Sequence, residues 1–133
     1  MNSSSRSSSH LSRRALFLAL LGMFGASACA QSGPSAYGAK VRFSKGTAIT
    51  FPDFELTYLG ERHVASKVYS RGFNFSDFKV SRGGKNVTVS WSSGTGELGP
   101  QDFTFEGRSF SLELSHTRKH GWLKDNEVVI EKK

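Results

Sequence analysis

Apolar and polar residues alternate with a period of two along most of the chain after residue 40. In residues 54–58, for example, Phe54, Leu56 and Tyr58 are separated by Glu55 and Thr57. Successive side chains of a strand point to opposite faces, so this pattern predicts strands that bury one face and expose the other. We expect the core to contain Phe54, Leu56, Tyr58, Val87, Val89, Trp91, Phe103, Phe105, Phe110, Leu112, Leu114, Val128 and Ile130.

Turn sequences separate the alternating segments. Arg82-Gly83-Gly84-Lys85 predicts a tight hairpin, because glycine readily adopts the positive φ of such turns, and Glu106-Gly107-Arg108 predicts a second one. No segment after residue 30 combines a 3.6-residue period with capping residues, so we expect no long helix. The sequence therefore predicts one all-β domain over residues 40–133, a small antiparallel β-sandwich or, alternatively, a small β-barrel.

The N-terminal segment has the pattern of a secretory signal. Residues 1–14 are rich in serine and carry three arginines, and residues 15–26 are uncharged and strongly apolar. This run is shorter than the roughly 20 residues that a transmembrane helix needs. We therefore expect residues 1–28 to be a signal peptide. Arg13-Arg14 also resembles a twin-arginine signal, so both the general secretory route and the twin-arginine route stay open.

The end of this segment allows two cleavage sites. Ala26-Ser27-Ala28-Cys29 resembles the lipobox of bacterial lipoproteins, which implies lipidation of Cys29 and anchoring to a membrane. Alternatively, Ala28-Cys29-Ala30 is a small-x-small site for ordinary signal peptidase, which would leave Gln31 first. Cys29 is the only cysteine, so the domain has no intramolecular disulfide. Residues 29–39, which are small, polar and interrupted by Gly and Pro, are expected to form a flexible tether.

Charge does not single out a nucleic acid partner. Three of the 18 basic residues lie in the signal segment, which leaves 15 against 11 acidic residues and a net charge of +4 for the rest. Residues 71–78 match most of an RNA-recognition pattern in which Phe73 and Phe75 would stack on bases. However, that fold requires a helix that residues 40–70 do not predict. We therefore expect both phenylalanines to be core residues, with no nucleic acid bound.

Two exposed segments are candidates for binding. Residues 92–100 hold three glycines and several hydroxyls, and form either a recognition loop or a long connection between strands. Residues 116–122 combine cations, histidines and a tryptophan in a predicted turn, without the Cys or carboxylate neighbours that would complete a metal site. The candidate binding residues are Ser93, Thr95, Glu97, Arg118, His120 and Trp122.

No pattern of catalytic residues is evident. The acidic residues are spread singly, and no nucleophile motif or phosphate-binding loop occurs. We therefore expect a non-enzymatic domain without cofactor or metal that binds another protein of the bacterial envelope. The sharpest version of this hypothesis is an inhibitor of a hydrolase that acts there. The alternatives are a structural accessory lipoprotein of an envelope assembly and, less favoured, a small hydrolase. We expect membrane contact only through a lipidated Cys29. Without lipidation, we expect the domain to be soluble in the periplasm or secreted.

Overall fold

The computed structural model describes residues 33–93 and 99–133, which form β-strands and connections and contain no helix. The strands are β1 (Lys40–Arg42), β2 (Ala48–Thr50), β3 (Glu55–Val64), β4 (Phe73–Arg82), β5 (Lys85–Ser93), β6 (Gln101–Phe105), β7 (Arg108–Glu113), β8 (His116–Thr117), β9 (Gly121–Trp122) and β10 (Glu127–Lys132). The prediction of an all-β domain is thus confirmed. Within these ranges no helix is long and apolar enough to cross a membrane.

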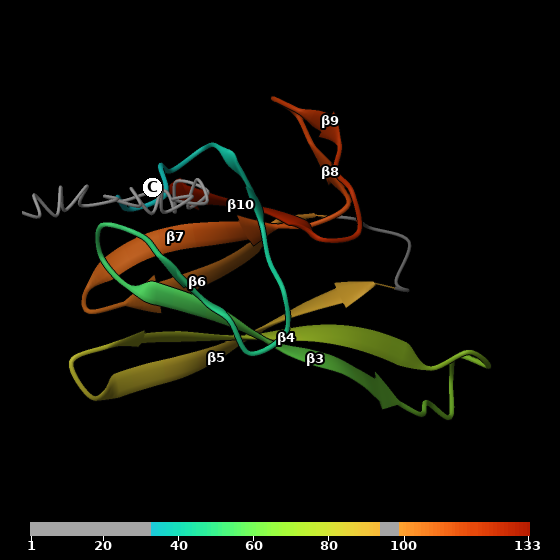
Figure 1. The fold of residues 1–133 in the computed structure, drawn as a ribbon. Coiled ribbons are helices and arrows are strands. Elements are labelled where there is room, and N and C mark those ends of the chain that lie inside the picture. The colour runs from blue at the N-terminus through green and yellow to red at the C-terminus, as the bar shows by residue number, and fades with distance from the viewer. Residues whose placement is uncertain (1–32, 94–98) are drawn as a thin grey trace, which may run out of the picture. The chain divides into compact units, whose positions relative to one another are not determined.

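Ten strands form two larger sheets and one small hairpin (Figure 1). One sheet has the strand order β1-β10-β7-β6 and the other the order β2-β3-β4-β5, while β8 and β9 pair only with each other. Every pairing between these strands is antiparallel. Across the described residues the two large sheets do not close into a barrel, so the alternative of a β-barrel is wrong.

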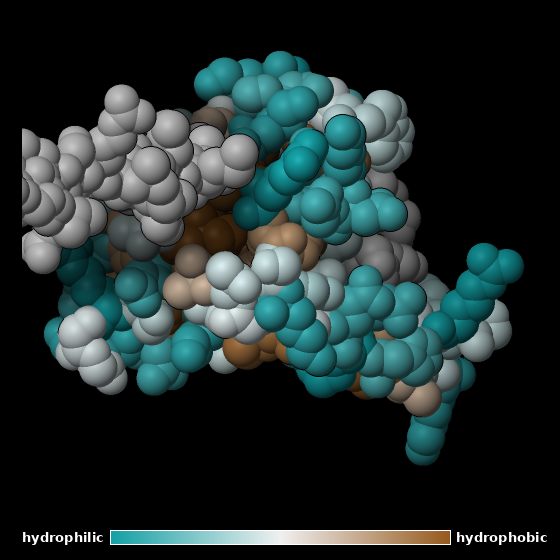
Figure 2. Space-filling model, in the orientation of Figure 1, coloured by the Kyte–Doolittle hydropathy of each residue, from teal (hydrophilic) through white to brown (hydrophobic). Residues whose placement is uncertain are grey.

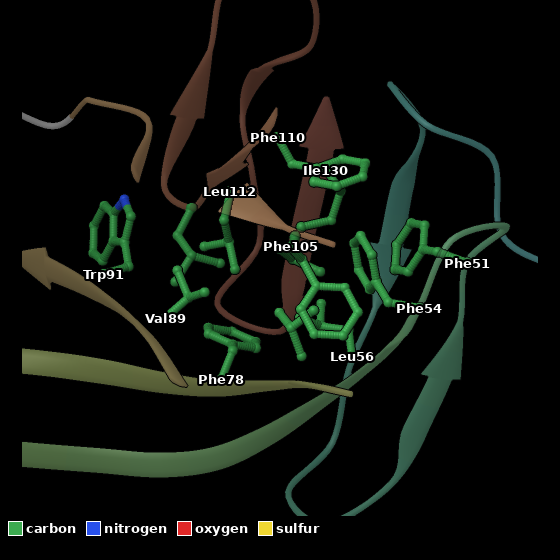
Figure 3. Close-up of a cluster of buried hydrophobic side chains, with 13 residues drawn as sticks. Phe51, Phe54, Leu56, Phe78, Val89, Trp91, Phe105, Phe110, Leu112 and Ile130 are labelled. Carbon is green, nitrogen blue, oxygen red and sulfur yellow. The ribbon is translucent and has the colours of Figure 1, made fainter. Parts of the chain in front are cut away.

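The core lies between the two large sheets. All thirteen residues expected in the core are buried in one cluster or packed against it. Side chains of both sheets point toward one another in this cluster, with Phe54 packed edge-on against Phe110 at a ring distance of 5.0 Å (Figure 3). On the face seen in Figure 2, hydrophilic residues cover much of the surface and hydrophobic ones show between the layers. The structure adds Tyr37, Val41, Phe43, Ile49, Phe51, Phe78 and Val80 to the predicted core.

Both predicted tight turns are present. Gly83 and Gly84 connect β4 to β5 with φ angles of 56° and 80°. Glu106 and Gly107 connect β6 to β7 with φ angles of 49° and 75°. Two consecutive positive φ angles define the primed turn whose twist matches that of the flanking strands, which explains the glycines at these positions.

The second half of the predicted tether belongs to the folded domain. The backbone N–H of Ser35 donates to the carbonyl of Thr50, and that of Gly38 donates to the carbonyl of Ile130. The Tyr37 ring stacks on Phe51 at 5.7 Å. Sequence composition alone suggested a flexible segment, but these contacts fix residues 33–39 against both sheets. Residues 29–32 and the predicted signal peptide, residues 1–28, lie outside the described residues.

A buried carboxylate ties one end of the two sheets together. Asp53, in the connection between β2 and β3, is 8% exposed and accepts hydrogen bonds from Tyr37 Oη (2.8 Å), Lys132 Nζ (3.0 Å) and the Arg108 guanidinium. Arg82 donates to the backbone carbonyl of Asp53 at 3.2 Å. These donors come from the segment before β1 and from β4, β7 and β10. The network therefore joins both sheets at the end where β4 turns into β5.

Phe73 and Phe75 are not core residues, contrary to expectation. Phe78 and Val80 of the same strand face the core and are fully buried. A side chain three positions away along a regular strand points to the opposite face, so Phe75 lies on the outer face of the sheet, and Phe73 lies there with it. Both rings remain partly exposed.

Among the described residues, every member of the core cluster lies within the compact unit of residues 31–133. A fragment beginning at Gln31 therefore retains the described core and both large sheets.

Candidate functional site

The hairpin of β8 and β9 interrupts the connection from β7 to β10 and is fixed at its base. Leu114 and Leu123, on either side of the hairpin, are 8% and 9% exposed. The backbone N–H of Leu123 donates to the carbonyl of Ser115 at 2.8 Å, and Ser115 has a φ of 68° that turns the chain away from β7. Two buried leucines and the backbone hydrogen bond between Leu123 and Ser115 thus hold this short hairpin in place.

His120 and Lys119 attach the far end of the hairpin to the segment before β1. The Nε2–H of His120 donates to the carbonyl of Gly38 at 2.7 Å, and Lys119 Nζ donates to the same oxygen at 3.2 Å. The backbone N–H of His120 also donates to Thr117 Oγ1 at 2.9 Å. His120, a candidate binding residue, therefore has an internal role in orienting the hairpin.

Trp122 projects from this hairpin into solvent. Trp122 is 75% exposed, and the His116 ring packs on it edge-on at 5.1 Å. Arg118 is also exposed, at the turn of the same hairpin. Isolated exposed hydrophobic residues are common, but tryptophan is the residue type most enriched among those that dominate protein interfaces. A tryptophan on a fixed hairpin loses little entropy when it is bound.

A depression of about 530 Å³ lies beside the hairpin and contains two carboxylates. Glu113 of β7 pairs with Val129, and Glu131 lies two residues further along β10, so both carboxylates are on the same face. Burial and then the Glu131 carboxylate raise the pKa of Glu113, while His116 and His120 oppose that shift. Arg118 and Lys119 line the same depression. The site thus presents both signs of charge within a small area.

Trp122 borders a second depression, a groove of about 410 Å³. Glu61 and Ser76, which pair between β3 and β4, form part of the opposite wall. The rest includes Trp91, whose Nε1–H donates to the carbonyl of Gly99 at 3.2 Å. The indole nitrogen therefore has its partner within the domain. The groove combines apolar side chains such as Leu114 and Leu123 with charged ones of both signs, among them Asp125 and Lys124.

A tight turn forms the end of this groove. Glu127 closes it, because its carboxylate accepts from the backbone N–H of Lys124 at 3.0 Å while its own N–H donates to the Lys124 carbonyl at 2.9 Å. The hydrogen bond from the Lys124 backbone is the main cause that lowers the pKa of Glu127. Glu127 therefore has a structural role at the groove.

The structure brings together only part of the predicted binding set. Arg118, His120 and Trp122 lie on the hairpin as expected. Ser93 ends β5, and Thr95 and Glu97 lie outside the described residues, as does Cys29. The sequence did not indicate Glu113 or Glu131 as neighbours of the hairpin, because their proximity depends on the pairing of β7 with β10.

In the described ranges, no group of three or more His, Cys, Asp or Glu side chains is arranged to hold a metal ion. Comparison with protein-family models, with curated proteins and with solved structures finds no match to this chain.

Proposed function

We propose that this chain is an exported, non-enzymatic β-domain that binds a protein partner in the bacterial envelope through the surface around Trp122. In this proposal residues 1–28 are a signal peptide, and the two layers of sheet form a β-sandwich that carries the hairpin. The sharpest version is a domain that inhibits a hydrolase acting in the envelope.

The exposure of Trp122 is the observation that carries the proposal. A side chain of this size buries a large apolar area in an interface at a low entropic cost, since it has only two rotatable bonds. The hydrogen bonds of His120 and Lys119 to Gly38 hold the hairpin in position before a partner arrives. Preorganisation of this kind increases affinity because less ordering is required on binding.

The charges around Trp122 favour a protein partner over a polymer of one charge sign. Arg118 and Lys119 line a depression with Glu113 and Glu131, and Glu61 lines the groove that Trp122 borders. A mosaic of both signs gives specificity through complementary pairing at the rim of an interface. A uniformly anionic ligand would be repelled by the carboxylates.

A comparison of captured proteins tests this proposal. Fragment 31–133 is immobilised as wild type, as Trp122→Ala and as Leu59→Ala, a control that truncates a side chain 41% exposed elsewhere. We expect one protein from an envelope extract to bind wild type and Leu59→Ala, and to bind Trp122→Ala at least about 30-fold more weakly, as for other interface tryptophans. Equal capture by all three variants would refute a role for Trp122.

The identity of the captured protein separates the three functional alternatives. A soluble enzyme retained in a one-to-one complex, and inactive in it, supports inhibition. A large membrane assembly supports the structural accessory lipoprotein. Substrate turnover by the fragment itself, abolished by one polar substitution such as Glu113→Gln, would support the small hydrolase instead.

Mass spectrometry of the mature N-terminus tests export independently. A diacylated Cys29 supports the lipoprotein, and a chain that begins at Gln31 supports ordinary cleavage. An intact chain that retains Met1 in the cytosol would exclude both.

A further inference from the structure

The connection between β3 and β4 has a defined conformation. We refer to residues 65–72 as the β3–β4 tip. Ser66 Oγ accepts hydrogen bonds from the backbone N–H groups of Val68 and Tyr69, each at 3.1 Å. Gly72 has a φ of 62°, and a Cβ at this position would lie 2.5 Å from the carbonyl oxygen of Val64. A hydroxyl cap at one end and an obligatory glycine at the other thus give the tip a specific shape.

This shape exposes apolar side chains. Val68 is 83% exposed and Tyr69 is 53% exposed, and Val64 at the base of the tip is 37% exposed. They are three of the five large hydrophobic residues that are exposed within the described residues. The Ser66 cap directs consecutive residues outward at the extreme end of a long hairpin (Figure 1). Exposed apolar side chains that gather at one place are candidates for a contact surface.

A row of aromatic rings supports the tip on the outer face of the sheet. The Tyr69 ring packs edge-on against Phe73 at 5.2 Å, and Phe73 lies 6.4 Å from Phe75. The Arg62 guanidinium lies over the Phe75 ring at 4.7 Å and donates to Asp77 at 3.0 Å. The row therefore connects Tyr69 to the body of the sheet, so the exposed ring is held in one orientation.

The tip itself, residues 65–72, carries Lys67 and Arg71 and no acidic residue, whereas Arg62 at its base is paired with Asp77. Lys67 and Arg71 flank Val68 and Tyr69 in the chain. Cations beside a small exposed apolar group are complementary to a surface whose apolar interior is covered by a layer of anionic groups.

We propose that the β3–β4 tip binds the surface of an anionic lipid bilayer, with Val68 and Tyr69 in the headgroup region and Lys67 and Arg71 near the phosphates. Tyrosine favours this depth because its ring is apolar and its hydroxyl remains hydrated. A stable protein interface typically buries about 800 Å² on each partner. A membrane contact requires only a few inserted side chains.

This contact goes beyond the proposed function, because it does not involve Trp122. It would orient the domain at a membrane whether or not Cys29 is lipidated. One acyl chain or one peptide contact holds a protein weakly, and two signals together give stable attachment.

Sedimentation of fragment 31–133 with lipid vesicles tests the proposal. Vesicles containing about one third phosphatidylglycerol in phosphatidylcholine are compared with vesicles of phosphatidylcholine alone, since each cation near an anionic surface strengthens binding about fivefold. We expect binding to the anionic vesicles only, with a clear loss at high ionic strength. No binding to either vesicle overturns the proposal, and binding of equal strength to both overturns the role of the cations.

Substitutions in the tip are compared with matched substitutions elsewhere. We expect K67E/R71E to weaken binding at least about 25-fold, because two cations are lost, and Val68→Ser to weaken it roughly tenfold. K40E/R42E reverses two exposed charges on β1, and Trp122→Ser removes the most exposed aromatic ring on the hairpin. Both controls should retain binding, with melting temperatures confirming that every variant is folded.

Two outcomes of this comparison would overturn the proposal. Equal losses in K67E/R71E and K40E/R42E would show that net charge, not the tip, attracts the membrane. Vesicle binding that survives every tip variant would locate the contact elsewhere. The capture experiment with Trp122→Ala does not affect the vesicle experiment. Either proposal can therefore be refuted while the other stands.

Discussion

Replacement of Asp53 by asparagine tests whether the buried carboxylate holds the two sheets together. The substitution keeps the shape of the side chain but removes the charge that Lys132 and Arg108 contact. A hydrogen bond to a charged group contributes about 1.5–3 kcal/mol. The side chains of Lys132 and Arg108 are 43% and 56% exposed, so water replaces part of each lost contact. We therefore expect the free energy of unfolding to fall by about 2–3 kcal/mol for both contacts together.

Urea unfolding of fragment 31–133 at neutral pH measures this loss. For a domain of about 100 residues it corresponds to a fall in melting temperature of roughly 10–20 °C. Asp125→Asn, at an exposed position, is the matched control and should change the free energy by less than about 0.5 kcal/mol. Tyr37→Phe removes the hydrogen bond that the hydroxyl donates to the Asp53 carboxylate and the one that it accepts from the Asp53 backbone N–H. It retains the ring stack and should cost about 1–2 kcal/mol. If Asp53→Asn is no more destabilising than Asp125→Asn, the network does not stabilise the fold.

Two further predictions concern pH. Hydrogen bonds from Arg62 and then Ser90 lower the pKa of Asp77, so its stabilisation is present above the unfolded pKa of about 3.8 and is lost as pH falls through the lower folded value. Asp77→Asn should therefore lower the free energy of unfolding by about 1 kcal/mol at pH 7 and by progressively less in acid. A difference in melting temperature between wild type and variant that stays constant from pH 7 into acid would contradict this. Burial and Glu131 raise the pKa of Glu113, so its ionisation weakens the fold as pH rises through that value. Glu113→Gln should therefore raise the melting temperature by a few degrees at pH 7 and not below pH 4, whereas a lower melting temperature at pH 7 would refute the reasoning.

The core was predictable because it depends on local periodicity. Each of the residues from Phe54 to Ile130 assigned to the core lies in a strand or next to one, where the alternation assigns the face without knowledge of the partner strand. The tight turns at Gly83-Gly84 and Glu106-Gly107 were predictable for a similar reason, since positive φ angles favour particular residue types locally.

Phe73 and Phe75 show where this reasoning fails. Alternating phenylalanines generally prefer the core, but the core occupies the other face of β4. Phe78 and Val80 are fully buried, and their spacing from Phe75 places it on the opposite face. The parity of these positions was present in the sequence, so the error was avoidable.

Contacts between distant segments were not predictable. Composition marked residues 33–39 as flexible, but Tyr37 lies against Phe51 and hydrogen bonds Asp53, 16 positions away. Glu113 and Glu131 share a face only because β10 pairs with β7. No local sequence pattern predicts either contact, because both depend on the order of the strands in the sheets.

The arrangement separates the groups that stabilise the domain from those that remain exposed. Arg82, at one end of β4, belongs to the network around Asp53, and Phe73, at the other end, supports the β3–β4 tip. Ten residues of strand place the two ends roughly 30 Å apart. Effects of substitutions at that separation are expected to add, because they share no contacts. The double variant Val68→Ser/Asp53→Asn should therefore have the same free energy of unfolding as Asp53→Asn alone. If the double variant is less stable by more than about 0.5 kcal/mol, the tip and the network are coupled through β4.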